Sequence, residues 1–86
     1  MSEFRPQVNS SKTLTKIKLD LSPDDSLLAI AFQYKLILWD LIKGTKMEIV
    51  EMKNICDVRF NKSGDKLIFG LYQGEAYKVD LDSVLN

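Results

Sequence analysis

The fold of this 86-residue chain is decided by residues 35–41, with the sequence KLILWDL. Apolar side chains dominate the run, and its isoleucine and tryptophan favour a β-strand. A polar break at Gln33-Tyr34 precedes the strand and Lys43-Gly44 follows it, so both ends are marked by turn residues. Residues 75–81, with the sequence EAYKVDL, end on the same aspartate and leucine. The chain therefore contains two comparable strands, one in each half.

The residues before this strand predict two further strands. Ile17, Leu19 and Leu21 alternate with charged residues, which predicts a strand with one buried face. Residues 22–25, with the sequence SPDD, predict a type I turn, with a helix cap as the alternative. The turn is favoured because the apolar run at residues 27–32 is short, like a strand buried on both faces. A hairpin is expected to join this run to residues 35–41.

The second half repeats the first at a fixed spacing. Residues 45–52 have no clear period and are predicted to form an outer edge strand, protected by its lysines and glutamates. Beyond them, residues 56–68 align with residues 17–29 at an offset of 39, and residues 78–81 align with 38–41 at an offset of 40. A period near 40 with about four strands per unit is typical of β-propeller blades.

The repeated segments resemble the WD-repeat (Trp-Asp repeat) family. Residues 21–29, LSPDDSLLA, are similar to the family's FSPDGxxLA segment, and residues 38–41, LWDL, to its LWDL box. In the second copy, residues 60–67, FNKSGDKL, the turn ending at Gly74 and residues 79–81 match in register. The resemblance covers residues 15–81. It implies an all-β fold of two antiparallel, four-stranded propeller blades, the second without an evident outer strand.

The resemblance also gives a predicted organisation along the chain. Residues 1–13 form a flexible segment or a short closing strand, with residues 4–8 as the strand candidate that completes a neighbouring copy. The remaining predicted units are a first blade over residues 14–53, an incomplete second blade over residues 54–81, and a C-terminal tail over residues 82–86 with room for one helical turn.

The sequence departs from the family pattern around the tryptophan. The Gly-His pair before the first strand is missing, and the hairpin turns carry Gln33-Tyr34 and Tyr72-Gln73 in place of an aspartate. The hydrogen-bonded tetrad of regular members therefore cannot form, and Trp39 is expected to be held by packing that buries about 150–250 Å². Cys56 is predicted to be a core thiol. The predicted structural anchors are Trp39, Asp40, Asp80 and Gly74.

Composition limits the chemistry that the chain can perform. Lys plus Arg and Asp plus Glu both number 12, so no global charge attracts nucleic acid or holds a membrane surface. One cysteine and no histidine exclude an internal disulfide and the usual structural zinc sets within one chain. No phosphate loop or nucleophile motif is present. We expect no enzymatic activity, no cofactor and no metal site. The chain also has no secretory signal or membrane-length apolar run, so the expected location is cytoplasmic or nuclear.

The function implied by the resemblance is a non-catalytic protein-interaction or scaffold module. Two blades leave outer faces uncovered, so self-association, docking on a protein partner or inclusion in a longer propeller is expected to cover them. Alternatives are a truncated fragment without independent role and an anion- or phosphoinositide-binding surface that uses Arg5, Lys12, Lys16 and Lys18. In the family, the turns at one end bind partners, and the matching positions here are Gln33, Tyr34, Lys35, Lys53, Asn54, Tyr72 and Gln73.

Overall fold

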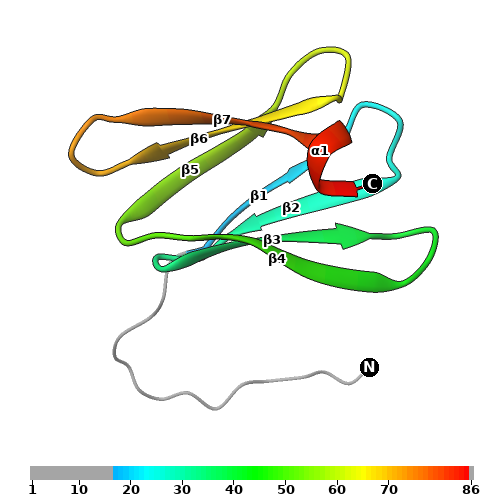
Figure 1. Ribbon diagram of the computed structural model, residues 1–86, viewed down its shortest axis with the longest axis horizontal. Coiled ribbons are helices and arrows are strands. Elements are labelled where there is room, and N and C mark those ends of the chain that lie inside the picture. The colour runs from blue at the N-terminus through cyan, green and yellow to red at the C-terminus, as the bar shows by residue number, and fades with distance from the viewer. Residues whose placement is uncertain (1–16, 86) are drawn as a thin grey trace, which may run out of the picture.

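The computed structural model describes residues 17–85, which form two antiparallel β-sheets and one short helix (Figure 1). The prediction of an all-β chain is confirmed. The predicted N-terminal segment, including the strand candidate at residues 4–8, lies outside the described residues, as do Arg5, Lys12 and Lys16 of the anion-binding alternative.

The first sheet has four strands in the order β1-β2-β3-β4, each antiparallel to the next. The predicted hairpin between β2 and β3 is confirmed, and β4 forms one edge of the sheet as predicted. The strands are β1 Lys18–Leu21, β2 Leu27–Ala31, β3 Lys35–Asp40 and β4 Thr45–Glu51.

The second sheet has three strands in the order β5-β6-β7. Within residues 17–85 it has no counterpart of β4, so the described part of the second sheet has three strands. The chain continues from β7 directly into α1, the helical turn that the tail was expected to form. The elements are β5 Ile55–Phe60, β6 Lys66–Leu71, β7 Ala76–Asp80 and α1 Leu81–Leu85.

The two sheets repeat the same backbone hydrogen bonds at the offsets found in the sequence. The turn between the first two strands of each sheet contains a residue with positive φ, Asp25 at 65° and Gly64 at 78°. Glycine adopts this conformation without the cost that a Cβ atom adds. The equivalent donor–acceptor pairs are Ser22–Leu27 at 2.8 Å and Asn61–Lys66 at 3.1 Å, with Leu41–Ser26 and Leu81–Asp65 both at 2.9 Å.

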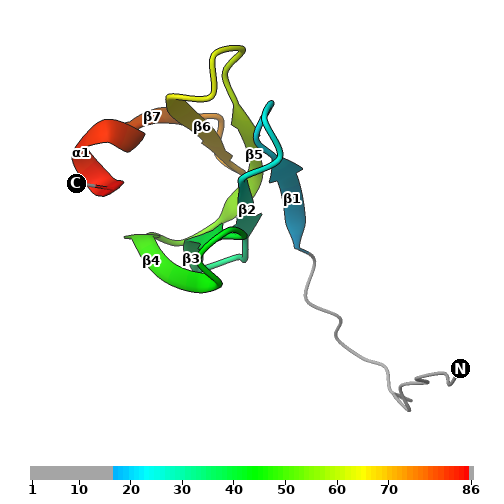
Figure 2. The same ribbon diagram turned by 90° about the vertical axis from the view of Figure 1, so that its right-hand side faces the viewer.

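The sheets pack face to face along β1, β2 and β5 and diverge toward β4 and β7 (Figure 2). Their facing surfaces form one hydrophobic core. Small side chains on β2, Ala29 and Ala31, let the sheets approach closely, and larger side chains on the neighbouring strands fill the space beside them. The largest buried contributors are Leu36, Leu38, Leu67, Phe69 and Leu81.

The two sheets meet through unlike faces. Val58 on β5 is buried against the first sheet, whereas its equivalent on β1, Leu19, points to the opposite side and is 56% exposed. Leu21, the equivalent of half-buried Phe60, is 45% exposed. The prediction that the apolar residues of β1 form its buried face is therefore wrong for the described residues. The residues of β1 do alternate between two faces, but the face that packs against the second sheet carries the polar residues, including Asp20.

A β-bulge changes the predicted core of the second sheet. The register of β5 with β6 shifts between Ile55 and Asp57, so one extra residue is inserted there. Ile55 is buried as a result, and Cys56 is only half-buried. The prediction of Cys56 as a core thiol is corrected by this shift, which the strict alternation of the sequence does not reveal.

One side-chain hydrogen bond joins the two sheets at the edge of β5. The Asp20 carboxylate accepts the Phe60 backbone N–H at 2.7 Å. Backbone amides alternate in direction along a strand, and Asn61 N–H donates to Lys66 O, so the Phe60 amide points to the free edge of β5, where no described strand supplies an acceptor. Asp20 therefore satisfies a backbone donor that the packing of the sheets would otherwise leave unpaired.

We expect Asp20→Ala to lower the free energy of unfolding by about 1–3 kcal/mol, because the Phe60 amide loses a charged acceptor in a partly buried position. Asp20→Asn is the matched control, since its amide oxygen keeps an acceptor of the same shape. Urea denaturation of the three proteins measures the difference. Equal losses for the two variants would contradict a role for the hydrogen bond.

Candidate functional site

The most distinctive surface is the outer face of the first sheet, which turns away from the second sheet. The strand register places its side chains in two rows across the strands. One row ends on Glu48 and the other on Lys46, both on the edge strand β4, and every other member is apolar. We call the six apolar residues the open face; they are Leu19, Ile30 and Ile37 in one row and Leu21, Leu28 and Trp39 in the other.

The open face is wet in the described chain. Both of its β1 leucines are exposed and its other four residues are only half-buried. Ile17, directly before β1, is 45% exposed and extends the same alternation. An apolar surface formed by neighbouring strands and rimmed by charges is typical of a protein-interaction site in a soluble protein.

Trp39 belongs to the open face and not to the buried core. Its ring is half-buried, and the Lys46 ammonium lies 4.9 Å from the ring centroid in a cation–π contact. The deep burial that was expected of Trp39 is therefore not observed. Trp39 still contributes apolar area, but it contributes it to a surface.

The outer face of the second sheet has a different character. The positions equivalent to Asp20, Ala29 and Leu38 are occupied by Arg59, Ile68 and Lys78, which form one row across the sheet. All three are exposed. The two free faces of the molecule are therefore unequal, one apolar and one carrying two cations.

The turn residues predicted to bind a partner are brought together by backbone hydrogen bonds. Gln33 O accepts Ile55 N–H at 3.0 Å, and Tyr34 O accepts Met52 N–H at 3.0 Å, which ties the β2–β3 turn to the β4–β5 link. Tyr72 N–H donates to Asn54 O at 2.9 Å, which adds the β6–β7 turn. We call this group the turn cluster; it contains Gln33, Tyr34, Lys35, Lys53, Asn54, Tyr72 and Gln73.

Two exposed tyrosines dominate the turn cluster. Tyr34 is 58% and Tyr72 is 62% exposed, and Tyr34 borders a shallow groove with Glu51, Met52 and Lys53. Lys35 lies over the Phe32 ring at 5.8 Å, so its stem covers apolar surface. The cluster is contiguous but polar and open, and it has fewer apolar side chains than the open face.

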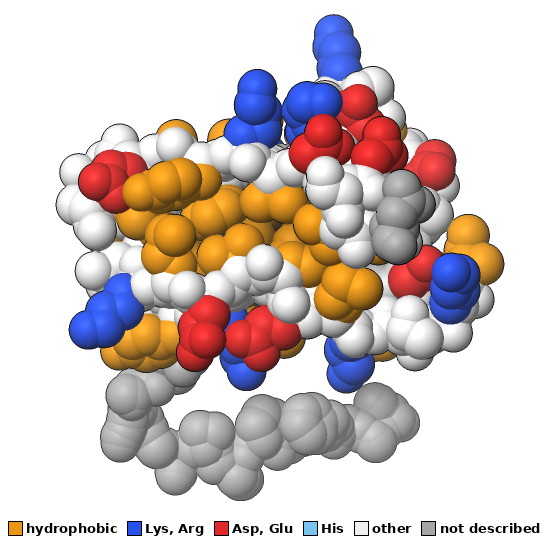
Figure 3. All heavy atoms as spheres, viewed as in Figure 1, with side chains coloured by type: hydrophobic (Ala, Val, Ile, Leu, Met, Phe, Trp, Pro, Cys, Tyr) orange, Lys and Arg blue, Asp and Glu red, His pale blue; other side chains and the backbone are white. Residues whose placement is uncertain are grey.

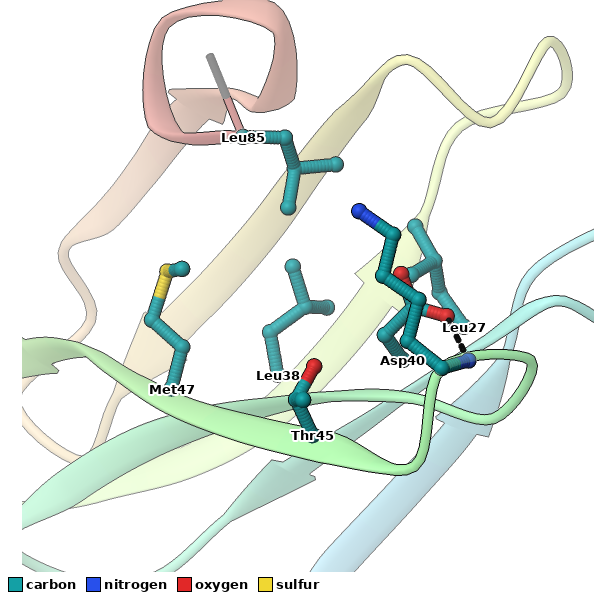
Figure 4. A pocket seen from close by; sticks show the side chains of 7 residues that line it. Leu27, Leu38, Asp40, Thr45, Met47 and Leu85 are labelled. Carbon is teal, nitrogen blue, oxygen red and sulfur yellow. Dashed lines mark hydrogen bonds between the residues drawn. The ribbon is translucent and has the colours of Figure 1, made fainter.

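The sheets leave an opening between β4 and β7. Figure 3 looks into it and shows hydrophobic side chains gathered in the middle, with charged side chains around the rim. A cavity of about 90 Å³ lies at one end, where Leu85 of α1 faces Met47 of β4 across Leu38 (Figure 4). Asp40 at its wall is engaged, because it accepts the Lys43 N–H at 3.0 Å. This cavity has room for little more than a few waters.

The remaining predicted anchors end strands or form turns. Asp40 accepts the Ile42 N–H at 3.0 Å, and Asp80 accepts the Asp82 N–H at 3.1 Å, so the two aspartates make the same contact in the two repeats. Gly74 has φ of 100° in the β6–β7 turn, a region that favours glycine. These contacts fit structural roles.

Two carboxylates in the turns have lowered pKa values for local reasons. Hydrogen bonds from Ser26 and Ser22 lower the pKa of Asp24. Hydrogen bonds from Asn61 and Ser63, with a smaller contribution from Lys66, lower the pKa of Asp65 to about 2. The three side chains of each turn occupy equivalent positions, but the carboxylate has moved from the second position to the third. Both carboxylates accept hydrogen bonds within their own turns. The described residues contain no cluster of three metal-ligating side chains.

Comparison with known proteins adds no family: no protein-family model matches the chain, and no curated protein has a significantly similar sequence. Within residues 17–85 no helix has the length and apolar character needed to cross a membrane.

Uncovered outer faces were expected from the sequence, but the side chains that form the open face were not assigned, and the predicted partner-binding residues all lie in or beside turns. The signal of the open face was present in the alignment of the two halves, where Asp20 and Leu38 of the first repeat correspond to Arg59 and Lys78 of the second. Charges at two of these positions indicate that the outer faces of the two sheets differ. Which face of β1 packs inward could not be read from the alternation alone.

Asp65 predicts a pH dependence of stability. Its folded pKa of about 2 lies below the ordinary aspartate value of 3.8, so its contribution to stability is present above about pH 4 and is lost as the pH falls to about 2. Asp65→Asn should therefore lose less stability than the wild-type protein between these two pH values. Urea midpoints at pH 4, 3 and 2 measure the difference. Asp82→Asn, whose carboxylate accepts no side-chain hydrogen bond within residues 17–85, should retain the wild-type slope.

Neighbouring residues on β3 test which face supports the fold. Leu38→Ala should lower the free energy of unfolding by about 2–5 kcal/mol, because it opens a cavity in the core. Trp39→Ala should cost less, since its side chain is half-exposed. Tyr34→Ala serves as the surface control, with an expected change within about 0.5 kcal/mol. A larger loss for Trp39→Ala than for Leu38→Ala in urea denaturation would contradict this assignment.

Proposed function

We propose that the chain is a non-catalytic protein-interaction module built from two WD-type blades, and that the open face is the surface on which a partner protein docks. The observation that carries the proposal is the open face itself. Its six apolar side chains are continuous over β1, β2 and β3 and are not covered by any of the described residues.

The propeller interpretation rests on three features of the two sheets. Their turns repeat the same hydrogen bonds, their sequences align at 39 to 40 residues, and the second sheet stacks on the first along the inner strands β1 and β5. In a propeller, each sheet is covered on both faces by its neighbours, because a single sheet cannot bury its two faces alone. Two sheets alone provide only one such contact, so a docked partner supplies the covering surface that the open face lacks.

Photo-cross-linking tests this function. The photoreactive residue p-benzoylphenylalanine replaces Ile30 on the open face or, as the matched control, Ile68 on the outer face of the second sheet. In extracts of the cells that express the protein, position 30 should yield a discrete protein adduct and position 68 should not. The adduct is identified by mass spectrometry and purified for binding measurements.

The purified partner should bind the wild-type chain at least tenfold more tightly than Ile30→Lys, because the lysine places a charge in the buried centre of the interface. Ile68→Lys should bind as the wild type does. The same adducts from both positions, or equal affinities for the three proteins, would refute the open face as the docking surface.

A further inference from the structure

The contact between the two sheets includes a hydrogen bond from a strand-edge amide to a carboxylate. The open face has an equivalent strand-edge amide that has no acceptor within residues 17–85. In the existing contact, Asp20 of the first sheet accepts the Phe60 amide at the free edge of β5. Leu21 is the residue of β1 equivalent to Phe60. The Leu21 amide on the open side of the first sheet therefore corresponds to the Phe60 amide that Asp20 accepts.

The Leu21 amide points to the free edge of β1. Ser22 N–H donates to Leu27 O across the hairpin, so the amide of the residue before it must point the opposite way in an antiparallel pair. The same geometry holds in the second sheet, where Asn61 N–H donates to Lys66 O and the preceding Phe60 amide turns outward to Asp20. Residues 17–85 supply no acceptor for the Leu21 amide. A sheet that covers the open face would bury this donor.

We infer that the open face binds a β-sheet of another polypeptide that carries a carboxylate at the position of Asp20 and small residues at the positions of Ala29 and Ala31, and that it rejects the outer face of the second sheet of another copy of this chain. The inference rests on the proposed function and names the chemistry of its partner. The incoming sheet would therefore offer the open face the same groups that the first sheet offers the second, namely a carboxylate like that of Asp20 and small side chains like those of Ala29 and Ala31.

The face that a second copy would offer in a head-to-tail contact, the outer face of its second sheet, carries the wrong groups. The outer face of the second sheet has Arg59 where the carboxylate is required, so a donor would meet the Leu21 donor. Lys78 stands at the position of Leu38, and docking would bury its ammonium against leucine and isoleucine side chains. Burial of an unpaired charge and of an unpaired amide both oppose association. Ile68 in place of Ala29 adds bulk where the sheets must approach closely.

The chain itself can be converted into the required probe. All variants compared carry Ile68→Ala, which restores a small residue at the position of Ala29; in this background Lys78→Leu removes the buried charge, and Arg59→Asp supplies the carboxylate. Chains with both substitutions should associate head to tail, the remade face of one molecule on the open face of the next. Sedimentation equilibrium compares the double variant with Lys78→Leu alone and with the wild-type chain, and circular dichroism verifies that each protein is folded.

The double variant should associate at least tenfold more tightly than Lys78→Leu alone, which is the lower end expected for one hydrogen bond to a charged group. Adding Leu21→Pro to the double variant should abolish this gain, because proline has no amide proton and is tolerated on an edge strand. Leu21→Ala, which shortens the side chain but retains the amide, should keep at least part of the gain.

Three outcomes would overturn the inference. Equal association of the double variant and Lys78→Leu would exclude a role for the carboxylate, and an unchanged gain in the presence of Leu21→Pro would exclude the Leu21 amide. Wild-type association as tight as that of the double variant would exclude selection against copies. None of these outcomes affects the cross-linking test, so the proposed function can stand when this inference fails.

Discussion

The structure depends on the packing of two sheets of the same design through unlike faces. If the sheets met through like faces, Leu19 and Leu21 would share a core with Val58 and Phe60, and the molecule would be closed in itself. Instead, the alanines and leucines on one face of the first sheet pack against the face of the second sheet that carries Val58 and Phe69. The difference between the two outer faces follows from this, because one face of each type is left over, and only one of the two is apolar.

Asp20 fixes the relative position of the sheets in a way that apolar contacts cannot. Apolar packing tolerates sliding, whereas a carboxylate that accepts one particular amide specifies a register between strands. The turn cluster adds three more backbone hydrogen bonds at the end of the sheets where the chain crosses from one to the other. The described fold is small, and it is held by directional bonds at its margins as well as by its core.

The sequence predicted the strands, their order along the chain and the repeat because each depends on local information. Alternation at residues 17–21 predicts a strand, and turn residues such as Gly64 and Gly74 mark where strands reverse. The direction in which each strand faces is different, since it depends on which sheet lies beside it. That dependence explains why Leu19 and Leu21 were placed inside, why Trp39 was expected to be deeply buried, and why Cys56 was assigned to the core despite the bulge at Ile55. The residues of the turn cluster lie together because chain connectivity alone brings these turns to one end of the sheets.

The inequality of the two free faces gives the molecule a polarity. Another sheet could pack on the open face, where apolar side chains are exposed. On the outer face of the second sheet, Arg59 and Lys78 are solvated. Growth in one direction is thus favoured and growth in the other is resisted by the cost of dehydrating two cations. The two outer faces therefore differ in how easily another sheet can pack on them, with little dehydration cost at the open face and a larger cost at Arg59 and Lys78.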